Sequence, residues 1–236
     1  MPDTKIVVIT GAGVSAESGL ATFRDAGGLW EGYDINEVAS IEGWRKDPEN
    51  VLSFYNLRRK QAAKAEPNEA HLALAELEDH YDVSIVTQNV DDLHERAGSN
   101  QVLHLHGELK KVRSINDPSL IKDIGSDAIE MGDVAEDGGQ LRPHVVWFGE
   151  MVPMIEPAAE EVSTADILIV IGTSLVVYPA AGLIDYARPN IPKYIVDPSD
   201  PQLYDREDWH HYKENAGTGV RKLADKLIKE KTNNGE

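Results

Sequence analysis

Residues 5–24 read KIVVITGAGVSAESGLATFR, and this stretch decides the fold. Its residues 6–9 form an apolar, largely β-branched run, which predicts a strand buried on both faces of a sheet. The next residues, 11–16, read GAGVSA and match the pattern G-x-G-x-x-A at a point where a strand is expected to give way to a helix. Backbone N–H groups at such a turn can cradle a pyrophosphate, so the stretch predicts a dinucleotide site.

The residues after this turn depart from an ordinary dinucleotide-binding unit. Such a unit brings a second strand, ending in an acidic residue that binds the ribose hydroxyls, about 20 residues after the glycines. No such strand follows here, because Gly19 interrupts the helix and Gly27 and Gly28 loosen the chain further. We therefore expect an extended loop that can cover a ligand.

The composition narrows the class of protein. A chain of 236 residues can bury a core as one large domain or as a main domain with a smaller one inserted. It has no cysteine, which excludes disulfides and thiolate zinc sites. The formal net charge of -18 disfavours binding to nucleic acids and anionic membranes. The first residues do not resemble a signal peptide and no apolar run reaches bilayer length, so we expect a cytoplasmic protein.

The rest of the chain alternates between expected strands and helices. Further apolar runs predict buried strands at residues 82–87, 101–105, 166–171 and 193–198. Helical spacing predominates from about residue 30 to 80, where Pro67 and Asn68 predict a helix start. Residues 110–140 show little periodicity and no strong core signal, which is typical of a surface excursion. About six parallel strands with interleaved helices predict an α/β protein with a doubly wound sheet.

Polar residues follow three of the expected strands, in the segments 11–15, 88–91 and 172–174. Open α/β sheets bind ligands at the carboxyl ends of their parallel strands. His106 follows a fourth strand. Taken singly, each segment also fits a turn or a helix cap, and a lone histidine after an apolar strand is more often structural than catalytic. Their expected convergence at one edge of the sheet is what indicates a site.

Five motifs occur in an order that resembles the sirtuin family of NAD-dependent protein lysine deacylases. They are GAGVSAESGLATFR, TQNVDDLHERAG, LHLHGEL, LRPHVVWFGE and IGTSLVVYPAAGL. The resemblance implies a single catalytic domain with a Rossmann-like large part, residues 1–29, 82–109 and 141–236, and a smaller part made from insertions at 30–81 and 110–140. It also implies NAD as the cofactor and acylated lysine side chains of proteins as the partners.

The resemblance implies a role for each matching residue. The NAD phosphates would be held by Gly11, Ala12, Gly13, Ser15, Gly172, Thr173 and Ser174. The loop over the nicotinamide ribose would contain Phe23 and Arg24. The nicotinamide pocket would be lined by Gln88, Asn89 and Asp91. With Asn89 and Asp91, His106 would complete the catalytic set as a general base on the ribose hydroxyls, a task that suits an imidazole near its usual pKa.

The resemblance also indicates where an acyl-lysine would bind. The lysine tunnel, and the edge along which the peptide adds as a strand, would be formed by Val146, Phe148, Gly149 and Glu150. Tyr55 and Arg58 share one face of an expected helix, where a hydroxyl and a guanidinium can bind one carboxylate. In FYNLRRKQ this pair resembles the sirtuin subgroup that removes succinyl, malonyl and glutaryl groups, so we expect a desuccinylase or demalonylase with deacetylase activity. The alternative is a core tyrosine beside a solvated pair, Arg58 and Arg59.

Two positions depart from the family pattern. Sirtuins usually carry four zinc-binding cysteines between the HGE and FGE motifs, whereas Ser114 stands at the first of these positions here and the other three are absent. Residues 110–140 offer no replacement set of ligands at credible spacing, so we expect no zinc. Asp197 stands where the family usually has an asparagine near the adenosine ribose. A carboxylate there can accept hydrogen bonds from the ribose and would repel a 2′-phosphate, which predicts NAD over NADP.

Other functions use parts of the same pattern. A mono-ADP-ribosyltransferase or NAD glycohydrolase would cleave the same bond of NAD, but the FGE segment argues against it. A non-catalytic module that binds NAD or ADP-ribose would not need the intact His106, Asn89 and Asp91. A hydride-transferring dehydrogenase would require a separate substrate domain, which the sequence does not offer. The sequence makes no prediction of the oligomeric state.

Overall fold

A six-stranded parallel sheet is the frame of the structure. The computed structural model describes residues 4–21, 29–30, 33–201 and 208–234. The strands follow the spatial order β11-β10-β9-β1-β4-β5. Their bounds are β1 (Lys5–Thr10), β4 (Asp82–Thr87), β5 (Val102–His104), β9 (Ile167–Ile171), β10 (Lys193–Val196) and β11 (Trp209–Tyr212). Strand β1 pairs in parallel with β4 on one side and with β9 on the other, which places the glycine turn that follows it at the middle of the sheet.

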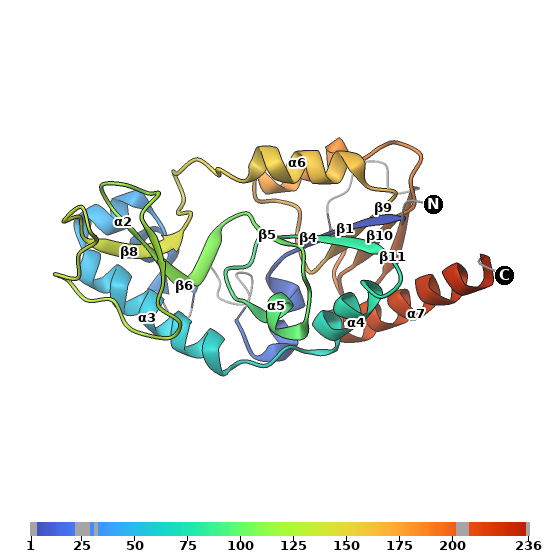
Figure 1. The fold of residues 1–236 in the computed structure, drawn as a ribbon, viewed down its shortest axis with the longest axis horizontal. Coiled ribbons are helices and arrows are strands. Elements are labelled where there is room, and N and C mark those ends of the chain that lie inside the picture. The colour runs from blue at the N-terminus through green and yellow to red at the C-terminus, as the bar shows by residue number, and fades with distance from the viewer. Residues whose placement is uncertain (1–3, 22–28, 31–32, 202–207, 235–236) are drawn as a thin grey trace.

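Helices cover both faces of this sheet (Figure 1). One face carries α4 (Glu69–Leu77) and α7 (Ala216–Asn234), and the other carries α6 (Ile155–Thr164) and the 3₁₀ helix η3 (Ala180–Tyr186). Successive side chains of a strand point to opposite faces, so Ile6 and Val8 pack with the first pair of helices and Val7 and Ile9 with the second. The arrangement confirms the predicted doubly wound α/β fold.

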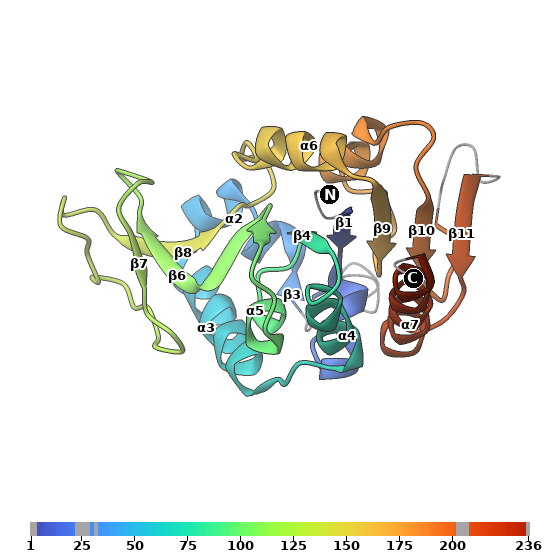
Figure 2. The ribbon, with the colours of Figure 1, turned by 45° about the vertical axis from the view of Figure 1, so that its right-hand side comes forward.

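A second module lies at one end of the parallel sheet, as Figure 2 shows. It combines an antiparallel sheet in the order β7-β6-β8 with three helices. These elements are α1 (Ile35–Val38), α2 (Ile41–Lys46), α3 (Pro48–Lys64), β6 (Gly107–Ser114), β7 (Ile121–Asp123) and β8 (Leu141–Val145). The module has its own core, in which Trp44 and Phe54 from the helices pack with Val112 and Trp147 from the sheet region. The smaller elements elsewhere are β2 (Leu29–Trp30), β3 (Tyr33–Asp34), α5 (Leu93–Ala97), and the 3₁₀ turns η1 (Ala12–Val14) and η2 (Ala16–Ser18).

The predicted strands are present, and two features differ from the expectation. Strand β11 was not predicted, because its sequence, WHHY, lacks the apolar run of a strand buried on both faces. The surface excursion expected at 110–140 contains the end of β6 and all of β7, and it buries Val112 and Ile129. The lysines and the arginine of β6 interrupt the apolar pattern from which a strand is recognised in a sequence. The predicted domain boundaries stay a prediction, and we note that β8, placed in the large part, pairs with β6 in the antiparallel sheet.

A hydrogen-bonded loop stands where the family has zinc ligands. Ser114 is buried, and its hydroxyl lies 2.9 and 2.8 Å from the two carboxylate oxygens of Asp137. The same Oγ accepts the Asn116 N–H at 3.1 Å, and Asp137 accepts the Gly139 N–H at 2.9 Å. A hydroxyl that donates to a carboxylate is not a thiolate-like ligand, and the chain has no cysteine. These residues therefore do not fit zinc, and hydrogen bonds cross-link the loop instead.

A helix that spans a membrane needs about 20 mostly apolar residues. The longest of the described helices, α7, has 19 residues and carries charges throughout, including Arg221, Lys222 and Asp225. None of the helices in the described ranges combines the length and the apolar character needed to cross a bilayer. The cytoplasmic location stays a prediction.

Candidate functional site

Two glycine turns from distant parts of the chain lie against each other at the end of the sheet. The Gly13 N–H donates to the Gly172 carbonyl at 2.9 Å, and the Gly11 N–H donates to the Ile171 carbonyl at 3.0 Å. A Cβ on Gly13 would lie 2.6 Å from Gly172 Cα, and a Cβ on Gly172 would lie 2.5 Å from the nitrogen of Val14. Gly172 also has a φ of 59°, which side chains rarely tolerate. Both turns therefore require glycine.

The turn after β1 does not lead into an α-helix, which corrects the expected strand-to-helix transition. It leads into η1 and η2, closed by the bonds from Val14 N to Gly11 O and from Ser15 N to Ala12 O. Gly19 then takes a φ of 84° and ends the segment, as its position in the sequence indicated. The predicted loop residues Phe23 and Arg24 lie outside the described residues.

Ser15 joins the first turn to the segment that follows β4. Its buried hydroxyl donates to Asp91 Oδ2 at 3.2 Å and accepts from Asn89 Nδ2 at 3.1 Å. Gln88 Nε2 donates to Thr173 Oγ1 at 3.2 Å, which ties the same segment to the turn after β9. The structure thus brings together the three polar segments that follow β1, β4 and β9. Burial raises the pKa of Asp91, although hydrogen bonds from the Leu93 N–H and the Ser15 hydroxyl act against it.

His106 projects beside this cluster. Its Nδ1 lies 3.0 Å from the Gln88 carbonyl oxygen, which can only accept, so Nδ1 carries the hydrogen and Nε2 keeps its lone pair. Burial lowers the pKa of His106, and the hydrogen bond to Gln88 opposes this only in part. The imidazole is therefore neutral near pH 7. Within the described residues no hydrogen bond reaches Nε2, which is the state required of a general base.

Two further histidines lie buried below the cluster. His71 Nδ1 accepts the Asn68 N–H at 3.2 Å as part of a capping box at the start of α4, which confirms the helix start predicted at Asn68. His71 Nε2 lies 3.5 Å from Ser15 Oγ, and the ring centroid is 4.9 Å from that of His94. Burial lowers the pKa of His71 to about 4 and that of His94 well below its usual value. Both rings are neutral at pH 7.

We expect this burial to make folding stability fall as the pH drops from 6.5 to about 4. The unfolded chain protonates His71 near pH 6.5, whereas the folded chain does so near pH 4, so acid favours unfolding across that window. The loss reaches about 3 kcal/mol, since each pKa unit is worth about 1.4 kcal/mol. Urea unfolding of the wild type and of His71→Gln between pH 4 and 7 measures it. The variant should show a pH slope smaller by about one proton, and an unchanged slope would contradict the assignment.

The pair predicted to recognise an acidic acyl group lies inside the second module. Tyr55 and Arg58 are 4% and 7% exposed, and Arg59 is 2% exposed. The alternative of a solvated arginine pair is therefore wrong for this structure. The Tyr55 hydroxyl accepts from Trp147 Nε1 at 3.1 Å. Burial raises the pKa of Tyr55, while Trp147 and the nearby charges of Arg142 and Arg58 act to lower it, so the hydroxyl stays protonated and can still donate.

Trp147 was not among the predicted site residues, although it stands within the motif LRPHVVWFGE. The residues predicted from this motif were its neighbours Val146 and Phe148, followed by Gly149 and Glu150. Val146 N–H donates to the His106 carbonyl at 2.8 Å, and Phe148 N–H donates to the Ala39 carbonyl at 2.9 Å. The segment therefore links His106 to the helical insertion. Phe148 is 46% exposed and Gly149 has a φ of 89°, so the chain turns outward after Trp147.

Glu150 faces the interior of the second module and does not face the cluster around Ser15. Its carboxylate accepts from Arg142 Nη1 at 2.6 Å, from Arg113 Nη2 at 3.3 Å and from the Trp147 N–H at 2.8 Å. The Arg142 guanidinium also stacks 3.3 Å from the Trp147 ring centroid. Through these contacts Glu150 joins two arginines and the Trp147 backbone within the second module. Its contact with an acyl-lysine stays a prediction.

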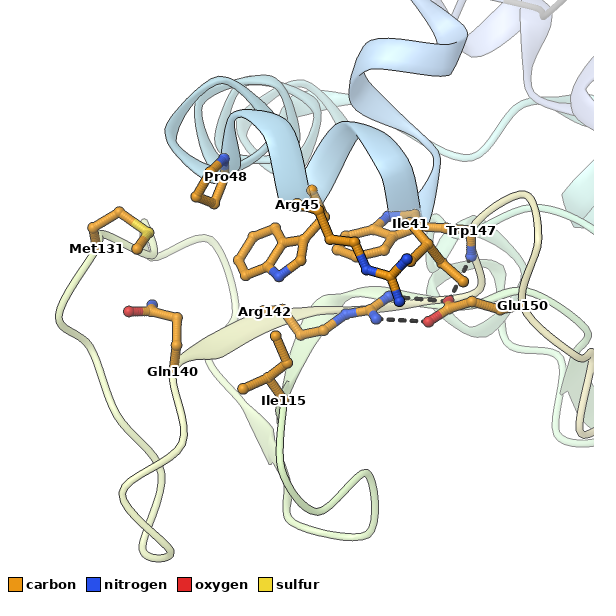
Figure 3. A pocket seen from close by; sticks show the side chains of 10 residues that line it. Ile41, Arg45, Pro48, Ile115, Met131, Gln140, Arg142, Trp147 and Glu150 are labelled. Carbon is orange, nitrogen blue, oxygen red and sulfur yellow. Dashed lines mark hydrogen bonds and ion pairs between the residues drawn. The ribbon is translucent and has the colours of Figure 1, made fainter.

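A pocket of about 500 Å³ opens next to this ion pair, between α2 and the antiparallel sheet (Figure 3). Trp44 and Trp147 form part of its wall, and Arg45 extends across it toward Arg142 and Glu150. Of the residues predicted to bind NAD or substrate, Glu150 alone lines it. The pocket therefore does not coincide with the cluster around Ser15.

The predicted adenosine-side residue, Asp197, follows β10. It is buried, and its Oδ1 accepts the N–H of Ser199 at 2.9 Å together with that residue's hydroxyl. The Gly172 N–H donates to the Val196 carbonyl at 2.9 Å, so Asp197 adjoins the second glycine turn. A carboxylate at this edge of the site suits the ribose role predicted for it.

The family follows from a comparison with family models. Residues 11–179 match the Sir2 family. The chain belongs to the Sir2 family. This Sir2-family chain is 54% identical over 223 residues to a protein of Helicobacter pylori strain J99 named NAD-dependent protein deacylase, with 94% of this chain and 95% of the relative covered. A Bacteroides thetaiotaomicron protein of the same name is 51% identical over 228 residues, with 94% and 97% covered.

Solved structures agree with the family assignment. A Sir2 homologue crystallised as an NAD complex superposes on this Sir2-family chain with a TM-score of 0.87 and 40% identity, covering 97% of this chain and 91% of the other. A structure described as Sir2 with p53 peptide and NAD+ gives a TM-score of 0.77 and 29% identity, covering 97% and 93%. The resemblance stated from the five motifs is confirmed.

Proposed function

We propose that the chain is an NAD-dependent protein lysine deacylase that prefers acyl groups carrying a carboxylate. Membership of the Sir2 family supports the reaction class, as do relatives of that name that share more than half of their aligned residues with it. Its proposed substrates are acylated lysine side chains of proteins, in line with the p53 peptide named in one similar structure. The preference for acidic acyl groups rests on Tyr55 and Arg58.

One observation carries the proposed reaction: the cluster of Ser15, Asn89 and Asp91 and the free Nε2 of His106 depend on the same loop after β4. NAD fits the groups present. The glycine turns offer backbone at close range for the pyrophosphate, for which we propose Gly11, Ala12, Gly13, Ser15, Gly172, Thr173 and Ser174. Beside Gln88, the amide of Asn89, the hydroxyl of Ser15 and the carboxyl of Asp91 are the partners that a nicotinamide amide needs.

The chemistry divides between NAD and the protein. When bound, NAD would supply the acyl acceptor: nicotinamide would leave ribose C1′, the amide bond to the lysine would break with uptake of one water, and the products would be nicotinamide, free lysine and acylated ADP-ribose. His106 accepts a proton from a ribose hydroxyl at Nε2, while its Nδ1–H on the Gln88 carbonyl keeps the ring in place. Phe23 and Arg24 are proposed to cover the ribose, and Asp197 to select NAD over NADP.

The proposed acyl selectivity follows from burial. An arginine that is 7% exposed is largely shielded from bulk water, so it can give a carboxylate on the acyl group a charge-assisted hydrogen bond that a neutral acyl chain cannot form. The Tyr55 hydroxyl donates to the same carboxylate while its oxygen accepts from Trp147. Val146, Phe148 and Gly149 provide the adjacent edge for the peptide.

The test compares kcat/KM with NAD for one peptide carrying either succinyl-lysine or acetyl-lysine. We expect the wild type to prefer the succinyl peptide and Arg58→Met to lose about 10- to 100-fold on it, because a charge-assisted hydrogen bond to a carboxylate disappears. Activity on the acetyl peptide should remain. Arg45→Met is the matched control, since it removes an exposed arginine from the neighbouring helix α2.

Each outcome of this comparison discriminates between functions. Equal succinyl preference in the wild type and Arg58→Met would reject the role of Arg58. Release of nicotinamide without loss of either acyl group would favour an NAD glycohydrolase or a mono-ADP-ribosyltransferase. Binding of NAD without its consumption would indicate a non-catalytic module.

A further inference from the structure

His104 makes the same type of contact as His106: each ring bonds to a backbone carbonyl of the loop after β4, and the carbonyl that His104 contacts belongs to the next residue in that loop. Its Nδ1 lies 3.0 Å from the Asn89 carbonyl oxygen, as His106 Nδ1 lies 3.0 Å from that of Gln88. The two rings differ at Nε2. That of His104 lies 2.7 Å from Glu95 Oε1, on α5. His104 therefore bridges the edge strand β5, helix α5 and the loop that carries Asn89.

The hydrogen bonds of His104 define its charge. A backbone carbonyl and a carboxylate both accept hydrogen bonds, so both ring nitrogens must donate and the ring is an imidazolium. Burial acts to lower the pKa of His104, but the hydrogen bond and charge of Glu95 outweigh it and raise the pKa. The His104 side chain is 7% exposed. Although Glu95, His104 and Glu108 offer ligand atoms within 4.8 Å of one another, this ring keeps no lone pair for a metal.

The other titratable groups around His104 come from three elements. Glu108 on β6 acts to raise its pKa, and this carboxylate is itself paired with Lys111 at 2.5 Å. Asp91 in the loop and His94 on α5 are near enough for the charge of His104 to lower their pKa values. Glu95 makes the direct hydrogen bond and is the group that keeps the ring charged.

Three polar atoms of Asn89 are hydrogen-bonded: its backbone N–H, its backbone carbonyl and its side-chain Nδ2. Its N–H donates to Thr87 Oγ1 at 3.0 Å, its carbonyl accepts from His104, and its Nδ2 donates to Ser15 Oγ at 3.1 Å. Loss of the His104 contact frees the carbonyl end of this residue. The peptide plane can then rotate, and the side chain loses its fixed direction toward Ser15.

We infer that His104 is a positioning residue: as an imidazolium paired with Glu95, it fixes Asn89 for the nicotinamide end of NAD. The inference rests on the proposed function, because that function places nicotinamide beside Asn89. It predicts that the Glu95–His104 pair acts on NAD binding and not on ADP-ribose binding, since ADP-ribose has no nicotinamide. It also predicts that the effect depends on pH when Glu95 is absent.

The test uses Glu95→Gln, which keeps an acceptor for His104 but removes the charge. Ring NMR signals of His104 should report a pKa above the ordinary histidine value of about 6.5 in the wild type and a lower pKa in the variant, where burial acts without the charge of Glu95. The Kd of the variant for NAD should rise about 10-fold from pH 6 to pH 8.5, the loss of one charge-assisted hydrogen bond. Its Kd for ADP-ribose should change less than about 2-fold.

Two further variants separate positioning from a merely structural effect. Glu108→Gln removes a second carboxylate whose oxygen lies within 4.8 Å of a His104 ring nitrogen but which is paired with lysine, so the variant's NAD affinity should follow that of the wild type at each pH. His104→Gln cannot titrate and should weaken NAD binding equally at every pH. A wild-type His104 pKa no higher than that of the Glu95→Gln variant, or equal weakening of NAD and ADP-ribose binding in Glu95→Gln, overturns the inference. If the pH signature appears but no acyl group is removed, the proposed function fails and the positioning role stands.

Discussion

Replacing His106 with asparagine lowers kcat/KM for acyl removal by about 10³-fold, within the range of a lost general base. The asparagine amide can still donate to the Gln88 carbonyl, as His106 Nδ1–H does, so the loop keeps its shape. What the variant lacks is the lone pair at Nε2. Steady-state rates with succinyl and acetyl peptides should fall together, because the base acts on the ribose and not on the acyl chain.

The pH profile gives an independent check on His106. Burial lowers the pKa of His106 below its usual 6.5, so the wild-type kcat/KM should stay level down to that pH and fall only below it. His210→Asn, which changes an exposed histidine on β11, is the control and should leave the profile unchanged. A His106→Asn enzyme within 10-fold of the wild type would exclude His106 as the base.

Replacing Glu150 with glutamine lowers the free energy of unfolding by about 3 kcal/mol. The carboxylate compensates two guanidiniums, those of Arg142 and Arg113, whose side chains are 8% and 12% exposed. Without it, two like charges remain together inside the module that holds Tyr55. The urea midpoint should therefore fall, whereas Glu160→Gln on the exposed face of α6 should have little effect.

A double-mutant cycle and a pH series test the cause of this loss. Arg142→Met should destabilise the Glu150→Gln protein less than it destabilises the wild type, since its partner is already gone. Burial acts to raise the pKa of Glu150, but hydrogen bonds from Arg142 and the Trp147 N–H hold it below the usual 4.5. The stabilisation is thus present above pH 4.5 and is lost as the pH falls through the lowered pKa. Additive effects of the two substitutions would contradict the ion-pair explanation.

Much of the fold could be predicted from the sequence, because strands buried on both faces leave continuous apolar runs. Residues 6–9 and 166–171 gave the centre of the sheet for this reason. Strands with one or both faces open to solvent carry no such run. Both β11, with two exposed histidines, and β6, with its basic side chains, were therefore missed or misread.

The candidate site was predictable where residue type alone limits the chemistry. Glycines at a strand end and a histidine after an apolar strand could be recognised from their positions. Contacts between side chains distant in sequence could not. The bond from Trp147 to Tyr55, the turn of Glu150 toward Arg142, and the bridge from His104 to Asn89 all depend on packing between separate elements.

The contact between Gly13 and Gly172 limits how this nucleotide site can evolve. Each glycine occupies space that a side chain on the other would need, although 158 residues separate them in the sequence. A first loop that carried a side chain at position 13 would clash with the second turn unless that turn changed as well. The two loops therefore have to change together, and chimeras between distant relatives should take both loops from the same parent.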